Sequence, residues 1–153
     1  MDRAFSFFVP GPVRGQGRPK AVSVNGHARV YQRAEDVSYK ALIQSYAMQK
    51  MEKLGIHAPA EPLDDGFIVS IRVRKAIPKG FSKKKRQAAE MGLVSPFSKP
   101  DLDNVAKIFL DALNGIVYRD DRYVKGLYVT RVYTDGMEGA EVAIAWSEEG
   151  GEG

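Results

Sequence analysis

A segment near the middle of the chain has a pattern that only one regular structure accommodates, an amphipathic helix. Its apolar residues recur at intervals of three and four, the spacing of a single helix face: Val105, Ile108, Phe109 and Ala112. The opposite face carries charge: Asp103, Lys107 and Asp111. Because Pro100 favours an extended conformation at the residue before it, the helix is expected to begin at or just after Asp103 and to end at Gly115.

This boundary matters for the acidic residues. Residues i and i+2 of an extended segment point the same way, so Asp101 and Asp103 converge if they precede the helix. Two such carboxylates repel each other unless a hard cation lies between them, and oxygen ligands suit magnesium or manganese. We expect a short strand over residues 116–118 and a turn that brings Asp121 back as a third carboxylate. Lys107 would direct an ammonium group at a phosphate or a developing oxyanion.

Each of these residues also has a simpler structural explanation. Asp103 could cap the helix by accepting a backbone hydrogen bond from Val105 or Ala106. Lys107 could form i,i+4 ion pairs with its charged neighbours on the helix, and Asp120-Asp121 could be a polar turn. One cap needs one carboxylate, whereas this region offers several, so the metal site is favoured, with Asp111 as the member most typical of a purely structural role.

The order of these residues resembles the signature of a known family. Lys99-Pro100-Asp101-Leu102-Asp103-Asn104, then Lys107, Leu110 to Gly115 and Asp120-Asp121, is similar to the motif of the RusA family of Holliday junction resolvases, which are common in phages and prophages. The resemblance implies magnesium binding by Asp101, Asp103 and Asp121 and a requirement for Lys107 in cleavage. It also implies a homodimer that nicks two opposed strands of a four-way DNA junction.

Length and composition set bounds on the rest. With 153 residues, 44% of them hydrophobic, the chain is long enough for one domain, expected over residues 1–147, with a flexible tail over 148–153. The absence of cysteine excludes disulfides and thiolate metal sites and is typical of a cytoplasmic protein. Neither a signal-like nor a membrane-spanning apolar run is present in the sequence, so a soluble protein with no membrane association is expected.

The pattern of elements predicts an α+β fold, a mixed β-sheet of about four to six strands with two long helices packed on it and a short basic helix outside. Strands are expected over residues 4–9, 21–24, 28–31, 67–74, 124–133 and 140–146. Helices are expected over 35–54 and 82–90 besides the one described above. The first helix is predicted to bury Val37, Ala41, Tyr46 or Ala47, Met48, Met51 and Leu54. Strand order is not predicted.

Basic residues gather in two stretches. The net charge of +4 permits binding to a polyanion, and the placement of the charge matters more than its size. We expect DNA backbone contacts from a glycine-rich loop near the N-terminus and from the short basic helix with the loop that follows it: Arg14, Arg18 and Lys20, then Lys83, Lys84, Lys85, Arg86 and Lys99. A plain surface loop and a solvated helix face remain the alternatives. The first loop lacks Walker spacing, so no nucleotide cofactor is expected.

These observations predict a magnesium-dependent endodeoxyribonuclease, with manganese able to substitute, that resolves Holliday junctions by paired symmetric nicks in DNA recombination and repair. Two alternatives remain open. One is a less selective metal-dependent DNA nuclease that uses the same residues. The other is a non-catalytic basic DNA-binding phage protein in which the aspartates are structural.

Overall fold

The computed structural model describes residues 2–17, 20–31, 33–57 and 65–147. Its strands are β1 (Asp2–Pro10), β2 (Lys20–Val24), β3 (His27–Tyr31), β4 (Phe67–Ala76), β5 (Val124–Thr134) and β6 (Gly139–Ser147). Its helices are α1 (Ala34–Leu54), α2 (Lys83–Glu90) and α3 (Leu102–Leu113), with a 3-10 turn η1 (Asp121–Tyr123). The tail predicted over 148–153 lies outside the described residues.

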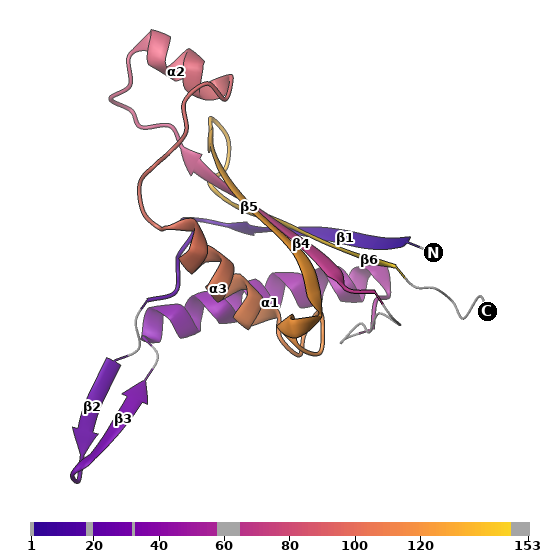
Figure 1. Cartoon of the computed structure of the whole chain (residues 1–153). Coiled ribbons are helices and arrows are strands. Elements are labelled where there is room, and N and C mark those ends of the chain that lie inside the picture. The colour runs from indigo at the N-terminus through magenta and orange to yellow at the C-terminus, as the bar shows by residue number, and fades with distance from the viewer. Residues whose placement is uncertain (1, 18–19, 32, 58–64, 148–153) are drawn as a thin grey trace.

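Four strands form one mixed sheet in the order β1-β6-β4-β5, and β2 and β3 form a separate hairpin that projects from the body (Figure 1). Strand β4 pairs antiparallel with β6 and parallel with β5. The hairpin turns at Asn25 and Gly26, whose φ angles of 52° and 78° are those of the turn type that favours this dipeptide. The predicted α+β class with a mixed sheet is therefore confirmed, and the sheet has four strands, within the four to six that were expected.

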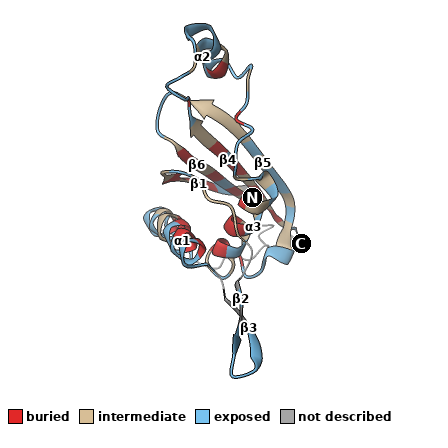
Figure 2. Ribbon diagram, turned by 90° about the vertical axis from the view of Figure 1, so that its left-hand side faces the viewer, coloured by how far each residue is buried: buried red, intermediate tan, exposed pale blue. Residues whose placement is uncertain are grey.

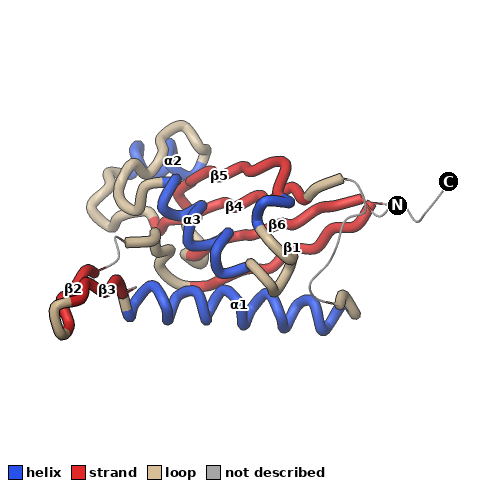
Figure 3. The backbone as a smooth tube through the Cα atoms, turned by 60° about the horizontal axis from the view of Figure 1, so that its bottom comes forward, coloured by secondary structure: helices blue, strands red, loops and turns tan. Residues whose placement is uncertain are grey.

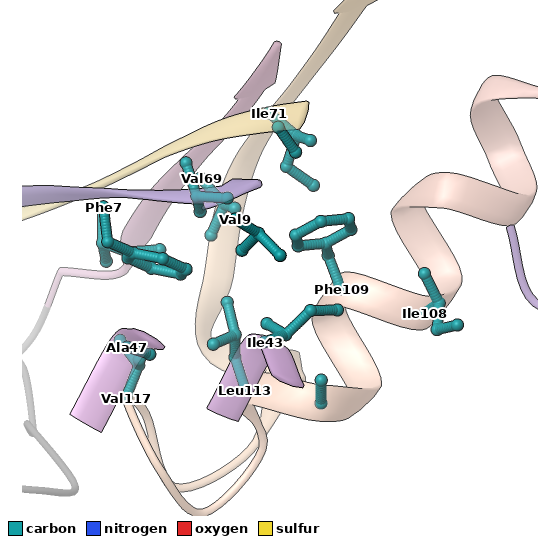
Figure 4. Packing of buried hydrophobic residues seen from close by; sticks show 14 of the residues in the cluster. Phe7, Val9, Ile43, Ala47, Val69, Ile71, Ile108, Phe109, Leu113 and Val117 are labelled. Carbon is teal, nitrogen blue, oxygen red and sulfur yellow. The ribbon is translucent and has the colours of Figure 1, made fainter. Parts of the chain in front are cut away.

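Helices α1 and α3 cover one face of the sheet (Figure 3). Phe67, Val69 and Ile71 of β4 point into this interface and are at most 1% exposed, as the alternating pattern predicts. The apolar face of α3 is buried as predicted, and Figure 4 shows Phe109 beside Val9 and Ile71 of the sheet. Tyr39 of α1 meets Phe109 edge to face with ring centroids 5.9 Å apart. The core thus holds α3 at a fixed position on the sheet.

The predicted inward face of α1 is wrong at most positions. Val37, Met48 and Leu54 are 52%, 47% and 49% exposed. Figure 2 shows that α1 has one buried side and one side exposed to solvent. The buried face instead comprises Asp36, Tyr39, Lys40, Ile43, Ala47 and Met51. Two of these are charged, and each has an ionic partner elsewhere in the chain: Asp36 pairs with Arg14 of the N-terminal loop and Lys40 with Asp111 of α3. A prediction that places every charged residue on the solvent side therefore assigns the wrong face of α1 to the core.

The strand predicted over residues 116–118 is also wrong. This segment is a turn in which the Gly115 N–H donates to the Tyr118 carbonyl at 2.7 Å, with an isolated bridge between Asn114 and Tyr118. Val117 and Tyr118 are 0% exposed, and the Tyr118 hydroxyl donates to the Leu110 carbonyl at 2.9 Å. The turn is thereby fixed to the C-terminal end of α3.

Other boundaries agree with the expectations. Gly55 and Gly115 follow α1 and α3 with φ angles of 70° and 76°, the left-handed conformation predicted for them. Helix α3 begins at Leu102, one residue earlier than expected, so Asp103 lies in its first turn. The extended arrangement that was expected to bring Asp101 and Asp103 together is therefore not formed. No helix of the described residues is long and apolar enough to cross a membrane.

Candidate active site

Asp101 and Asp103 lie at the N-terminal end of α3, both exposed. Asp101 is the cap residue with extended φ and ψ angles of −66° and 146°, but its side chain caps no backbone group. Asp103, in the first turn, accepts a hydrogen bond at 3.0 Å from the N–H of Asn104, not from Val105 or Ala106. The capping alternative for Asp103 is therefore wrong, the side chain of Asp101 caps no backbone group either, and both residues are exposed.

The N-terminal loop packs directly against this end of α3. The N–H of Gln16 donates to the Asn104 carbonyl at 3.0 Å. A Cβ atom at Gly15 would lie 2.9 Å from the Cβ atoms of both Asn104 and Pro100, so only glycine fits without displacement. Loop and helix together line an open pocket of about 360 Å³ whose walls include Arg33, Lys99 and Asp101. Asp101 thus stands at the edge of a pocket that carries cationic side chains.

Arg14 has an internal role that its sequence context does not reveal. Its Nε donates to Oδ1 of Asp36 at 2.6 Å, while the Gly17 N–H donates to Oδ2 at 2.8 Å. Burial alone would raise the pKa of Asp36, but these hydrogen bonds and the charges of Arg14 and Arg33 together lower it. Asp36 therefore fastens the loop to α1, and the charge of Arg14 is largely balanced within the protein.

The structure describes some of the other basic residues of this region. Arg18 lies outside the described residues, and Lys20 begins β2 with a side chain that is not described. Lys99 is exposed. Arg33, which the sequence analysis did not select, lines the pocket beside Asp101. Its position directly before α1 is the only signal that could have indicated it.

Lys107 occupies the middle of the exposed face of α3. Neither of the i,i+4 ion pairs considered for it forms among the described residues. Asp111, one turn further along, pairs instead with Lys40, which projects from α1 and is 8% exposed. The ammonium group of Lys107 is consequently exposed on the same helix face as Asp103.

A second group of acidic residues lies at the C-terminal end of α3. Desolvation, followed by the neighbouring carboxylates of Asp120 and Asp111, raises the pKa of Asp121, while a hydrogen bond from Asn114 opposes this shift. Asp120 caps η1 by accepting from the Arg122 N–H at 2.9 Å. Oδ1 of Asn114 is buried and has no hydrogen-bond partner. This region therefore concentrates negative charge and unused oxygen acceptors.

The two ends of α3 are not brought together within one chain. Asp103 and Asp111 are separated by eight residues of helix, a rise of about 12 Å. Among the described residues, no group of three aspartate, glutamate, histidine or cysteine side chains is arranged to hold a metal ion. The prediction that Asp121 folds back onto Asp101 and Asp103 is thus wrong for a single chain, because the buried turn at Val117 and Tyr118 keeps it at the far end.

The basic helix α2 lies beyond one end of the sheet, where it contacts β5, and the chain returns from it to the start of α3 (Figure 1). Ser82 caps it by accepting from the Lys85 N–H at 3.1 Å. Lys83, Lys84 and Lys85 are exposed, whereas Arg86 is partly buried and donates to the Pro78 carbonyl at 3.2 Å. The exposed lysines of α2 can bind a polyanion. The loop that follows α2 connects them to Asp101.

The donors at both ends of α3 fit a hard divalent cation. Asp101 and Asp103 offer carboxylate oxygens that no cap occupies, and Asp121 and Asn114 offer further oxygens. These four donors are all oxygen ligands, and the described residues contain no cysteine. The chemistry of this donor set therefore favours magnesium or manganese over zinc.

Comparison with known proteins identifies the family. The family model described as endodeoxyribonuclease RusA matches residues 10–145. The chain is also 34% identical over 137 residues to the uncharacterized protein YqaN of Bacillus subtilis (strain 168), an alignment that covers 88% of this chain and 91% of YqaN. Since the family match extends over most of the chain and includes both ends of α3, the chain belongs to the RusA endodeoxyribonuclease family.

Proposed function

We propose that this protein is a magnesium-dependent endodeoxyribonuclease that resolves four-way DNA junctions by paired symmetric nicks, as expected in recombination and repair. The observation that supports the proposal most strongly is the state of Asp101 and Asp103. Both are exposed at the start of α3 and neither side chain caps the helix, and Asp101 lines a pocket together with Arg33 and Lys99. Exposed carboxylates that cap no helix and lie next to cationic side chains are suited to hold a metal ion that also contacts a phosphate.

Different residues would serve metal binding, catalysis and DNA binding. Bound magnesium, for which manganese can substitute, would activate water and neutralise charge on the phosphodiester. Asp101, Asp103 and Asp121 would hold the ion. Lys107 would place its exposed ammonium near the non-bridging oxygens, where negative charge develops. Lys99 and the lysines of α2, Lys83, Lys84 and Lys85, would hold the DNA backbone.

We further propose that the functional unit is a homodimer in which two chains share each site. The turn that carries Asp121 is anchored by buried residues, so a movement of this turn along α3 to Asp103 would disrupt the core. A symmetric partner can bring the same residue to the open end of α3 without any such movement. Because a symmetric pair forms the contact twice, a dimer would hold two sites, one for each of two opposed strands.

The test is cleavage of a synthetic mobile four-way junction by the purified protein with magnesium. We expect symmetric paired nicks, and we expect Asp101→Asn, Asp103→Asn and Asp121→Asn to abolish them while junction binding persists. Asp135→Asn, in the exposed turn between β5 and β6, is the matched control and should cut normally. Normal cutting by the three site variants would refute the site assignment.

A linear duplex of matched sequence distinguishes the proposed selectivity from general nuclease activity. A junction resolvase leaves this duplex intact, whereas a less selective nuclease cuts both substrates at similar rates. Binding without cleavage at every magnesium and manganese concentration would show instead that the protein is a non-catalytic DNA-binding protein.

A further inference from the structure

The loop between α2 and α3 exposes apolar side chains to an unusual degree. Met91, Leu93 and Phe97 are 72%, 70% and 86% exposed, which makes them the three most exposed large apolar side chains among the residues whose burial is described. They lie within seven consecutive positions. Single exposed apolar residues are common, but a run of three, one of them aromatic, is typical of a surface that binds something.

Phe97 is displayed by a loop that the protein holds in place. Pro96, directly before it, is buried. On the other side, Arg131 of β5 donates to the Ser98 carbonyl at 3.0 Å, and Lys75 of β4 donates to the Lys99 carbonyl at 3.0 Å. The backbone after Phe97 is therefore tied to the sheet and the residue before it is buried, so the aromatic ring is presented to solvent at low cost in conformational entropy.

The charge around this apolar surface favours DNA over a second copy of the chain. Between residues 75 and 99 the sequence carries one acidic residue, Glu90, and these basic ones: Lys75, Lys79, Lys83, Lys84, Lys85, Arg86 and Lys99. A symmetric contact through this region would place like charges against each other, which opposes association. A polyanion meets the same surface with opposite charge.

Phe97 is also near the proposed site of cleavage. It precedes Asp101 by four residues, so the two Cα atoms are at most about 14 Å apart even if the chain between them is fully extended. An aromatic ring at this distance reaches bases within a few nucleotides of a phosphate held at Asp101. Aromatic side chains stack on exposed bases, and apolar side chains insert where base stacking is already interrupted.

We propose that Phe97 stacks on a base at the branch point of the DNA, next to the phosphodiester that is cut, and that Met91 and Leu93 extend the apolar surface around it. This inference rests on the proposed function in taking branched DNA as the substrate and Asp101 as part of the cleavage site. It assigns to the loop a role in recognising the interrupted stacking of a junction, separate from the cationic contacts that bind any DNA.

The experiment uses the full-length protein with Asp101→Asn, which is expected to bind without cutting. Trp146, the only tryptophan, is 4% exposed, so a tryptophan introduced by Phe97→Trp gives a separable signal. We expect the junction to quench the fluorescence of the tryptophan at position 97 strongly and a linear duplex to quench it much less. Phe97→Ala should weaken junction binding on the order of ten-fold, the size expected for loss of one stacked base, while Phe97→Trp retains it. Met137→Ala, equally apolar and 66% exposed in the turn between β5 and β6, should bind as the unmodified protein does.

Two results would overturn the inference while leaving the proposed function intact. One is junction binding and cleavage by Phe97→Ala that match the unmodified protein. The other is emission from the introduced indole of Phe97→Trp that is already shifted to short wavelength without DNA, together with loss of dimer in Phe97→Ala, since this would show that a second copy of the chain covers the ring. Failure of the unmodified protein to bind or cut any branched DNA would overturn the proposed function and this inference together.

Discussion

Arg14 and Asp36 form an ion pair, with 2.6 Å between Nε and Oδ1, that ties the N-terminal loop to the start of α1. The Asp36 side chain is 3% exposed and that of Arg14 is 35% exposed, so the carboxylate is buried and the guanidinium reaches the surface. The same loop contacts α3 through Gln16 and Asn104. The pair therefore supports the wall of the pocket beside Asp101, although it lies outside the family motif.

We expect Asp36→Asn to lower the free energy of unfolding at pH 7 by about 1.5–3 kcal/mol, the usual range for hydrogen bonds to a charged group. The pKa of Asp36 is lowered from 3.8, so its contribution is present above pH 3.8 and is lost as the pH falls through the lower folded value. Urea titrations at several pH values should show the variant and the unmodified protein converging in acid. Glu35→Gln, which removes an exposed carboxylate 3.8 Å from Arg14, is the control and should change stability little. A difference between Asp36→Asn and the unmodified protein that persists unchanged at low pH would contradict the explanation.

Gly15→Ala should destabilise the protein by about 1–3 kcal/mol, because the new methyl group would overlap Asn104 and Pro100 at 2.9 Å. The rate of junction cleavage should fall as well, since displacement of Pro100 would also move Asp101, the next residue. Gly80→Ala introduces the same methyl group where no atom lies within 4 Å and serves as the control. Thermal unfolding and cleavage rates of both variants test this, and equal behaviour of the two would show that the close approach is unimportant.

Lys40→Met should destabilise the protein at neutral pH because Asp111 would then face the carboxylate of Asp121 without its cationic partner. Asp111→Asn in the same chain should recover part of the loss. A double-mutant cycle measured by urea unfolding should give a coupling of about 0.5–3 kcal/mol between the two residues. Strict additivity of the two single substitutions would mean that the pair contributes nothing specific.

Asp121→Asn should separate stability from activity. The pKa of Asp121 is raised above 3.8, so its charged form costs stability at neutral pH and the cost is relieved as the pH falls through the folded value. Without divalent ions the variant should therefore melt at the same temperature as the unmodified protein or higher, and with magnesium it should not cut junctions. A lower melting temperature at neutral pH without metal would indicate a structural role for this carboxylate.

The sequence was sufficient where a repeating pattern determines burial. The spacing of Val105, Ile108 and Phe109 correctly identified the buried face of α3, and alternation did the same for β4. The pattern failed for α1, since the partners of Asp36 and Lys40 lie on distant elements that a local pattern does not contain.

The site was predictable in its residues more than in its geometry. The motif identified the exposed aspartates at the start of α3, but the path of the chain beyond Gly115 depends on the burial of Val117 and Tyr118, which short apolar runs do not distinguish from a strand. A proposal of three carboxylates in one chain consequently becomes a proposal of a site shared by two.

The most direct test of this shared site is a mixed dimer. Chains carrying Asp101→Asn and chains carrying Asp121→Asn, each inactive alone, would be produced together with different tags and purified through both. In such a dimer one site combines both substitutions, and the other combines an intact Asp101 with an intact Asp121 from the partner. We predict that the mixed dimer nicks one strand of the junction and leaves the opposed strand uncut. Absence of nicking by the mixed dimer, under conditions in which the unmodified protein cuts both strands, would contradict the shared site.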